Sequence, residues 1–492
     1  MTGIKDATYW KQQLEQKKLS AEELLQLTAD KIEKLNPTYN AVVASNIELA
    51  KQDLSVSKKG YFAGVPFPLK MLGQDRAGLS ATAGSRLFSE AIATKNSNYV
   101  NSLLAAGLTP FAQTNAPEFG FKNVTDPLLY SKTKNVWNPL HYSGGSSGGA
   151  ASAVASGMFP MAGASDGGGS IRIPASFSGL IGLKMTRGRM PQGPGGFRSW
   201  QGASISGALT VSIRDTAAFV AEMQTLQEPA AYQTALLDRE KLLTLPAADR
   251  PLKIAFSYEA PFPETPLSAD AKAALTKAVH FLEAQGHQLT EIPFPIANMR
   301  ELIDGYYLMN AAETAAMLLP VERANQRLLT TDEIEPLSLA MLNAGRNIPA
   351  SSYIDVLDNW DAATASLKAS VFNQFDFFLT PTTAKPAPRL DDILIPNAVS
   401  EKLTASAELT TDENLQAITE AFVASLAHTP YNFVSNLTGQ PSLSLPVYVN
   451  EETNLPTGVQ LWGRKNSEIE MLSLAKEFED QQQFILPDYY KN

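Results

Sequence analysis

The sequence predicts an α/β fold that forms one large domain. A strand at residues 254–256, a helix at 269–285 and a strand at 288–292 follow one another as in the βαβ units of a parallel sheet. Apolar stretches at residues 64–72 and 375–382 predict two more buried strands. Neither an internal repeat nor a linker of disordered composition divides the 492 residues. We therefore expect one continuous domain.

The first part of the chain is predicted to be helical, over residues 5–35. Ser20 and Glu23 match a capping box at the start of the second helix, in which each side chain accepts a hydrogen bond from the other residue's N–H. The pair Asn36–Pro37 is expected to end this helix. Helices in such a position most often serve packing or an oligomer surface.

The middle of the chain alternates between helices, strands and one long loop. A helix is predicted at 97–106, a short strand at 108–113, a helix at 215–226 and mostly helical structure at 297–370. The glycine- and proline-rich loop at residues 192–207 contains Phe197, Trp200 and Ser204. Long loops without structure of their own are usually functional, so this loop lines a substrate pocket or wraps the surface.

A lysine lies inside the apolar stretch at residues 64–72. Lys70 is unusual there because lysine is rarely buried without a functional reason. The ordinary alternative is a lysine whose amine reaches the surface along its aliphatic stem. A glycine-rich loop follows, with Gly73, Gly78 and Gly84. The residues by themselves leave both interpretations open.

Two serines are surrounded by glycines, Ser146 in GGSSGG and Ser170 in GGGSIRIP. Glycines let a substrate approach the main chain closely. The run from Gly167 to Gly169 can turn several N–H groups into one concavity, which suits an anion or an oxyanion. Ser170 would then be a nucleophile at the rim of that concavity.

Two other interpretations of these loops fit less well. Residues 144–148 match the G-x-S-x-G nucleophile elbow, with His280, His287 and His428 further along the chain. An elbow needs a strand directly before it, and residues 138–143 make a poor strand. A phosphate-binding loop does not fit, because neither serine loop carries the G-K-[ST] ending of a P-loop.

The stretch at residues 143–191 resembles the signature sequence of the amidase signature family, whose members hydrolyse amides with two serines and a lysine. GGSSGG and SDGGGSIRIPASFSGLIGLK match without a gap, and weaker similarity extends from about residue 63 to about residue 464. The resemblance implies a central mixed β-sheet covered by helices on both faces. It also implies that no metal and no organic cofactor take part.

The resemblance assigns a role to each residue of a Ser–Ser–Lys relay. Ser170 is the expected nucleophile, and Ser146 is the bridging serine after a cis peptide bond from Gly145. Lys70 is the base, and its burial should lower its pKa so that it is neutral. The expected oxyanion donors are the backbone N–H groups of Gly167, Gly168, Gly169 and Ser170.

Three further positions match supporting residues of the family. Ser147 matches a serine that supports the relay, while Asp166 and Arg172 match charged residues that hold the nucleophile loop. The family usually has threonine before the aspartate, and threonine or another residue after it. Ser165 and Gly167 at these positions suggest a slightly looser oxyanion loop.

Two other matched segments leave their roles open. Met71 stands where the family usually has an aspartate after the lysine, so this polar support of Lys70 is missing from the sequence. Asn115 and Glu118 match a TNxxEFG segment, with structural roles at least as plausible as functional ones.

Composition excludes several classes of function. A net charge of −10 without a basic cluster argues against a nucleic-acid surface. The absence of cysteine excludes disulfides, thiolate zinc sites and a cysteine nucleophile. No signal-peptide core and no apolar membrane span are visible. We expect a cytoplasmic monomer or homodimer that acts on a small-molecule amide, with neither nucleic acid nor membrane as partner.

The resemblance also predicts how one domain, residues 1–492, is divided. Helices occupy 1–60, the catalytic core 61–250, a variable and largely helical substrate region 251–372, and the return to the core 373–492.

Three functions stay open. The continuation after the signature resembles the free-standing amidases, among them hydrolases of cyclic 6-aminohexanoate dimers, which act on linear or cyclic amides. The alternatives are the glutaminase subunit of a tRNA-dependent amidotransferase and a homologue that only binds an amide.

Overall fold

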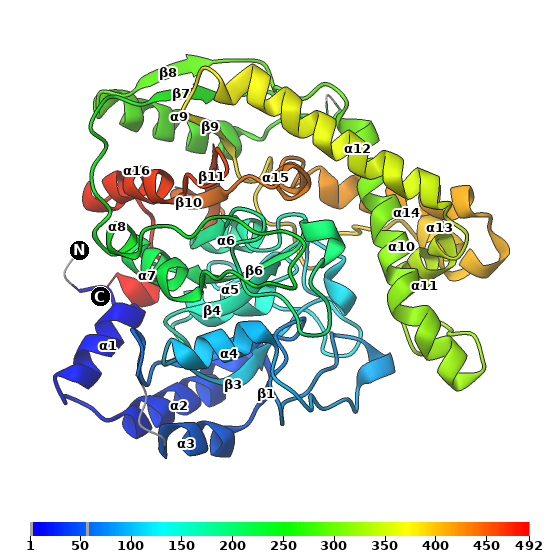
Figure 1. The fold of residues 1–492 in the computed structure, drawn as a ribbon, viewed down its shortest axis with the longest axis horizontal. Helices are drawn as coiled ribbons and strands as arrows, with labels where there is room; N and C mark the ends of the chain where they lie inside the picture. Colours follow the sequence, from blue (N-terminus) through cyan, green and yellow to red (C-terminus); the bar gives the residue numbers. More distant parts are fainter. Residues whose placement is uncertain (1–2, 56–58, 263, 492) are drawn as a thin grey trace.

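In the computed structural model of the chain, which describes residues 3–55, 59–262 and 264–491, the strands form two sheets (Figure 1). The smaller sheet has the order β1-β3-β2 and the larger one the order β4-β6-β5-β10-β11-β9-β7-β8. The strands are β1 (Val42–Ser45), β2 (Pro66–Lys70), β3 (Thr109–Thr114), β4 (Ala162–Asp166), β5 (Ile181–Lys184), β6 (Ile205–Thr210), β7 (Lys253–Phe256), β8 (Gln288–Glu291), β9 (Phe377–Pro381), β10 (Ser442–Asn450) and β11 (Leu455–Gly463).

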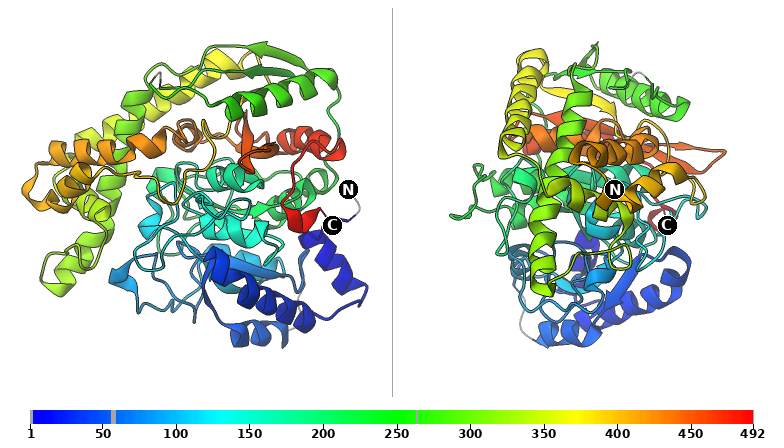
Figure 2. Two further views of the ribbon diagram at one scale, coloured as in Figure 1. Left: turned by 180° about the vertical axis from the view of Figure 1, so that it is seen from behind. Right: turned by 90° about the vertical axis from the view of Figure 1, so that its right-hand side faces the viewer.

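The larger sheet is mixed and is covered by helices on both faces, as predicted. In the order β4, β6, β5, β10, β11 and β9, each strand pairs antiparallel with the next. In contrast, β7 runs parallel to both of its neighbours, β9 and β8. On one face, Leu183, Leu443 and Leu461 share a hydrophobic core with α7 (Ile213–Met223), α9 (Ala269–Ala284) and α16 (Glu468–Asp480). The opposite face packs against two further clusters, which include α5 (Gly148–Ala155), α6 (Arg172–Ser178), α10 (Met299–Asn325) and α15 (Asn432–Thr438) (Figure 2).

The smaller sheet is an addition to the predicted single sheet, and it contains the strand that ends at Lys70. β2 runs parallel to β3 and has no second strand partner among the described residues. Pro66 and Pro68 have no backbone N–H groups, so they cannot donate the hydrogen bonds that a second neighbouring strand would need. The Lys70 N–H donates instead to Gln74 Oε1 at 2.8 Å, and Gln74 Nε2 donates to Ala164 O at 2.9 Å in β4. Side-chain hydrogen bonds thus join the two sheets at the lysine.

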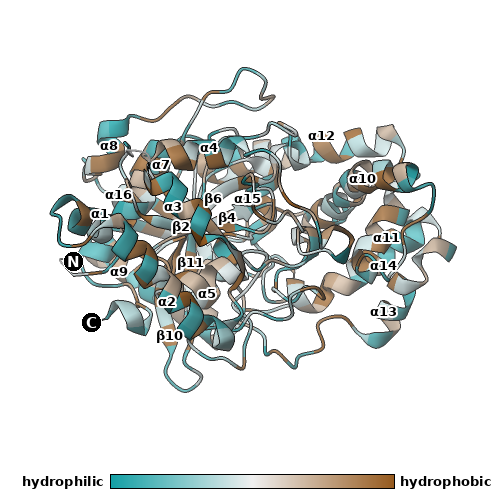
Figure 3. Cartoon of the chain, turned by 90° about the horizontal axis from the view of Figure 1, so that it is seen from below, coloured by the Kyte–Doolittle hydropathy of each residue, from teal (hydrophilic) through white to brown (hydrophobic). Residues whose placement is uncertain are grey.

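A group of helices extends to one side of the larger sheet, at the right of Figure 1. Its members within residues 299–367 agree with the prediction of helices over 297–370. Figure 3 shows brown and teal residues alternating along these helices, as expected for helices that bury one face. Besides α10, the group consists of α11 (Pro336–Gly345), α12 (Ala350–Leu367), α13 (Asn397–Thr404) and α14 (Thr411–Leu426).

The N-terminal region confirms the capping box but not the predicted helix end. The Ser20 and Glu23 side chains accept each other's backbone N–H at the start of α2 (Ala21–Tyr39). The prediction that Asn36–Pro37 ends this helix is wrong, since the helix continues to Tyr39. Asn36 Oδ1 instead accepts the N–H groups of Ala41 and Val42, both at 2.8 Å, and so terminates the helix one turn later.

The remaining helices are α1 (Ala7–Glu15), α3 (Ile47–Ser55), α4 (Asn98–Ala105) and α8 (Arg239–Thr244). No helix in the described part of the chain combines the length and the apolarity needed to cross a membrane.

Candidate active site

The structure brings the two predicted serines and the lysine to one place. Lys70 ends β2, Ser146 precedes α5, and Ser170 lies between β4 and α6. Lys70 Nζ lies 2.7 Å from Ser146 Oγ, within hydrogen-bond distance. Ser146 and Ser170 line the same cavity. A lysine in contact with one serine, and a second serine in the same cavity, are compatible with a base, a bridging hydroxyl and a nucleophile.

The backbone before Ser146 packs tightly enough to exclude side chains. The Gly145–Ser146 peptide bond is cis, which confirms the expectation from the resemblance. A Cβ on Gly145 would lie 2.5 Å from the backbone nitrogen of Val124, and one on Gly144 would lie 2.7 Å from Pro174 Cα. Only glycine fits at these two positions without moving the neighbouring backbone.

Lys70 is buried and is supported by hydroxyl groups rather than by the missing aspartate. Ser165 Oγ lies 2.9 Å from Lys70 Nζ, and Met71 is buried beside it. Burial lowers the pKa of Lys70 to about 7, although the charge of Asp166 acts in the opposite direction. A substantial share of this lysine is therefore neutral near pH 7 and able to accept a proton.

The predicted set of oxyanion donors needs one correction. The Gly169 N–H donates to Asp166 Oδ1 at 2.7 Å, so this group already has an acceptor. The N–H groups of Gly167, Gly168 and Ser170 make no hydrogen bond to another described residue. The donors that remain open are therefore these three. Sequence reasoning could not separate them, because the hydrogen bond depends on how the loop folds back over Asp166.

Asp166 and Arg172 form a fully buried ion pair beneath this loop. Arg172 Nε and one terminal nitrogen donate to the two Asp166 oxygens, both at 2.9 Å, which makes the pair bidentate. Arg172 also donates to Asn436 Oδ1 and Gln460 Oε1, each at 2.7 Å. Burial alone would raise the pKa of Asp166, but the charge and hydrogen bonds of Arg172 and Asn436 lower it to about 2. The pair thus fixes the loop that carries Ser170.

Ser147 acts on the site through Ser165. Its hydroxyl lies within hydrogen-bond distance of the Ser165 carbonyl oxygen (3.3 Å) and accepts the Ser165 N–H (3.4 Å). It therefore holds Ser165, whose own hydroxyl contacts Lys70.

The other candidate polar residues lie elsewhere. Asn115 donates to Ser131 O and Thr133 Oγ1, and Glu118 accepts from Ser85, so both serve the structure of neighbouring loops.

The histidine alternative has no geometric basis. His287 pairs with Glu477, the His428 ring contacts the Pro386 carbonyl, and His280 is exposed. No strand directly precedes Ser146 either.

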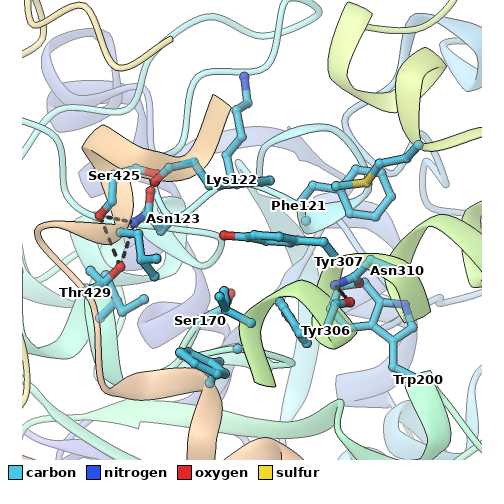
Figure 4. A pocket seen from close by; sticks show the side chains of 18 residues that line it. Phe121, Lys122, Asn123, Ser170, Trp200, Tyr306, Tyr307, Asn310, Ser425 and Thr429 are labelled. Carbon is cyan, nitrogen blue, oxygen red and sulfur yellow. Dashed lines mark hydrogen bonds between the residues drawn. The ribbon is translucent and has the colours of Figure 1, made fainter. Parts of the chain in front are cut away.

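Two cavities meet at Ser170, and they share Gly120, Phe121, Ser170 and Trp200. The first, called the aromatic cavity, has an empty volume of about 570 Å³ (Figure 4). Its aromatic lining consists of Phe121, Trp200, Tyr306, Tyr307, Phe422 and Phe433. The second, called the polar cavity, has about 1000 Å³. Its polar lining includes Ser146, Ser165, Gln192, Ser204, Ser206 and Glu313.

Trp200 and Phe121 form the wall between the two cavities. Their rings stack with centroids 6.2 Å apart and planes 15° apart. Trp200 confirms that the long loop lines the pocket, as one of its two interpretations predicted. Sequence reasoning missed Phe121 and Glu313, because nothing in their local sequence distinguishes them from packing or surface residues.

No cluster of histidine, aspartate or glutamate suited to holding a metal ion occurs among residues 3–55, 59–262 and 264–491.

Comparison with known proteins relates the chain to amidases. The sequence profile of the family named Amidase matches residues 23–472. The lipoamidase of Enterococcus faecalis is 34% identical over 480 residues, which cover 96% of this chain and 62% of that protein. The 6-aminohexanoate-cyclic-dimer hydrolase of Paenarthrobacter ureafaciens is 27% identical, over 96% of this chain and 94% of that protein.

A solved structure gives the same result for the fold. The structure of 6-aminohexanoate cyclic dimer hydrolase complexed with substrate superimposes with a TM-score of 0.87, at 25% identity and with 99% of both chains covered.

Proposed function

Because the chain belongs to the amidase family, we propose that it hydrolyses a carboxamide C–N bond through an acyl-enzyme on Ser170. The family and the enzyme class, an amidohydrolase, agree with the prediction from the two serine loops. The observation that carries the proposed mechanism is the 2.7 Å contact between the buried Lys70 amine and Ser146, in a cavity that also reaches Ser170.

The proposed reaction begins with the proton relay. Neutral Lys70 accepts the proton of Ser146, which accepts the proton of Ser170 as the Ser170 oxygen attacks the carbonyl carbon. The tetrahedral intermediate then collapses, the C–N bond breaks, and the same proton returns through Ser146 to the leaving nitrogen. Water then attacks the acyl-enzyme and gives its proton through Ser146 to Lys70. When the ester bond breaks, the acid leaves and the proton returns through Ser146 to the Ser170 oxygen.

The oxyanion of the tetrahedral intermediate is stabilised best by hydrogen-bond donors that are already in position before the reaction. We assign this role to the N–H groups of Gly167, Gly168 and Ser170, which remain open in the loop held by Asp166 and Arg172. The helical region at residues 251–372 contributes Tyr306 and Glu313 to the cavities, which supports a role for it in substrate choice.

Linear and cyclic amides are both reasonable substrates, since the relatives named above include a lipoamidase and a hydrolase of a cyclic dimer. These relatives favour a free-standing amidase over an amidotransferase subunit.

Labelling with a fluorophosphonate, followed by peptide mass spectrometry, tests the proposed nucleophile. We expect the adduct on Ser170, no adduct in Ser170→Ala, and labelling slowed by about 100-fold or more in Lys70→Ala. The exposed residues Ser89 and Lys272 provide matched controls, and Ser89→Ala and Lys272→Ala should label like the wild type. An adduct on Ser146 or Ser147, or labelling that does not depend on Lys70, would overturn the mechanism.

A further inference from the structure

We propose that the substrate is the amide of an apolar acid with a positively charged amine, and that Glu313 binds the charge. The acyl half would occupy the aromatic cavity and the amine half the polar cavity. This inference rests on the proposed function, because it uses the direction of the relay to assign the two halves.

The position of Ser146 decides which half lies where. The leaving nitrogen must receive its proton from Ser146, so the amine half must lie on the side of the relay. Ser146 lines the polar cavity and is absent from the described residues that line the aromatic cavity. Ser170 lines both cavities, which places the reacting carbonyl at their junction. The acyl chain therefore extends into the aromatic cavity, on the other side of the Phe121–Trp200 wall.

The aromatic cavity suits an uncharged chain because Lys122, the one charged side chain among the described residues that line it, is already paired. Asn123 Nδ2 donates to Ser425 O at 2.9 Å and to Thr429 Oγ1 at 2.8 Å, as the dashed lines in Figure 4 show. Lys122 is ion-paired with Asp126 (2.7 Å) and Glu335 (2.9 Å). Its amine points away from the cavity in Figure 4. What remains for a ligand is mainly the surface of aromatic rings.

The polar cavity contains a carboxylate without a cation. Glu313 is the one charged side chain among the described residues that line it. Glu313 Oε1 accepts from the Tyr353 hydroxyl at 2.7 Å and from Gln201 Nε2 at 3.4 Å, which orients the carboxylate. Its Oε2 accepts no hydrogen bond from a described residue, and no described lysine or arginine forms an ion pair with it.

A half-buried carboxylate in this setting favours a cationic ligand. An ammonium group donates charge-assisted hydrogen bonds to a carboxylate, and these are about twice as strong as neutral ones. The serines and Gln192 around it can solvate the rest of an amine fragment. An anionic fragment would meet the charge of Glu313 with no basic side chain in the cavity to offset it.

Three octanamides with one acyl group and different amine halves test the proposal. The amine halves are aminopentyl, hexyl and carboxypentyl, which carry a positive charge, no charge and a negative charge at similar length. We expect kcat/KM for the aminopentyl amide to exceed that for the hexyl amide by about tenfold, with the carboxypentyl amide slowest. In Glu313→Gln, the aminopentyl and hexyl amides should react alike.

Two further variants make the result specific to the site. Glu313→Lys should reverse the order, so that the carboxypentyl amide becomes the best of the three. Asp355→Asn removes an exposed carboxylate on the neighbouring helix α12 and should keep the wild-type preference.

The outcomes separate this inference from the proposed function. Equal rates for the charged and neutral amides, or a preference that survives Glu313→Gln, would overturn the role of Glu313. If Ser170 reacts with a fluorophosphonate but none of the three amides is hydrolysed, the substrate class is wrong. If Ser170 does not react, the proposed function itself fails.

Discussion

At the scale of single residues, the central feature is Lys70, a lysine whose pKa is lowered by burial to about 7. The buried Lys70 amine contacts the hydroxyl groups of Ser146 and Ser165, and burial is the largest influence on its pKa. The sequence indicated an unusual lysine, but it did not indicate what would replace the aspartate absent at Met71. Ser165 looked only like a departure from the family, because its contact with Lys70 crosses between two sheets.

The pKa of Lys70 predicts the pH dependence of the reaction. Because the relay needs the neutral amine, kcat/KM should rise with pH through a midpoint near 7, the folded-state pKa. It should then reach a plateau instead of rising up to the pKa of about 10.4 that a free lysine has. The measurement is a pH–rate profile with a neutral amide.

Lys70→Met is the control for that profile. It should lower kcat/KM by about 100-fold or more, because general-base catalysis typically contributes that much. A wild-type midpoint near 10, or the same midpoint in Lys70→Met, would assign the titration to another group.

At the scale of elements, the loop between β4 and α6 is shaped by aromatic side chains from distant segments. A Cβ on Gly168 would lie 2.5 Å from the Tyr306 hydroxyl on α10, and one on Gly167 would lie 2.7 Å from the Trp200 ring. The glycines predicted to form the oxyanion hole thus have a second reason to be glycine. Sequence alone could not supply it, because Tyr306 lies far along the chain.

This contact predicts a pair of compensating substitutions. Gly168→Ala should lower kcat/KM by about 100-fold, since the methyl group pushes the loop and its N–H donors out of place. Adding Tyr306→Phe removes the hydroxyl that the methyl group meets and should restore part of the rate. Gly196→Ala, with no atom within 4 Å of the added Cβ, is the control for rate measurements. A double variant no faster than Gly168→Ala would contradict the steric account.

The same loop depends on the Asp166–Arg172 pair for stability. Arg172→Met leaves a buried carboxylate without its cation, and the free energy of unfolding should fall by about 3–5 kcal/mol. Denaturant unfolding at neutral pH measures this difference. Adding Asp166→Asn removes the unpaired charge and should recover part of the loss. A wild-type midpoint for Arg172→Met would show that the pair does not hold the fold.

The regular elements were largely predictable, and their junctions were not. The strands and the helix of residues 253–291 follow local periodicity, and the structure has them within a few residues of their predicted bounds. The end of α2 depended instead on the Asn36 side chain folding back onto Ala41 and Val42. Local sequence likewise did not show that β2, with Pro66 and Pro68, would form the edge of a separate sheet.

At the scale of the whole molecule, the site is assembled where the sheets meet the helices of the variable region. In the proposed mechanism the two serine loops and the strand of Lys70 supply the chemistry, while Tyr306 and Glu313 on α10 line the aromatic and the polar cavity. The resemblance predicted the first group by residue number. It could not predict the second, because pocket residues of this region follow no common motif.

This arrangement predicts that the chain works without a partner subunit. Light scattering coupled to size exclusion should give the mass of a monomer or homodimer, and the same fraction should hydrolyse amides. Activity that appears only after adding a tRNA-dependent amidotransferase subunit would favour the glutaminase alternative instead.

Trapping the acyl-enzyme tests the central claim most directly. The protein would be mixed with the p-nitroanilide of octanoic acid, quenched in acid during turnover, digested and analysed by peptide mass spectrometry. We predict an octanoyl group on the peptide that contains Ser170, located on Ser170 itself by fragmentation, and none in Ser170→Ala. An octanoyl group on Ser146 or Ser147, or hydrolysis that persists in Ser170→Ala, would contradict the account.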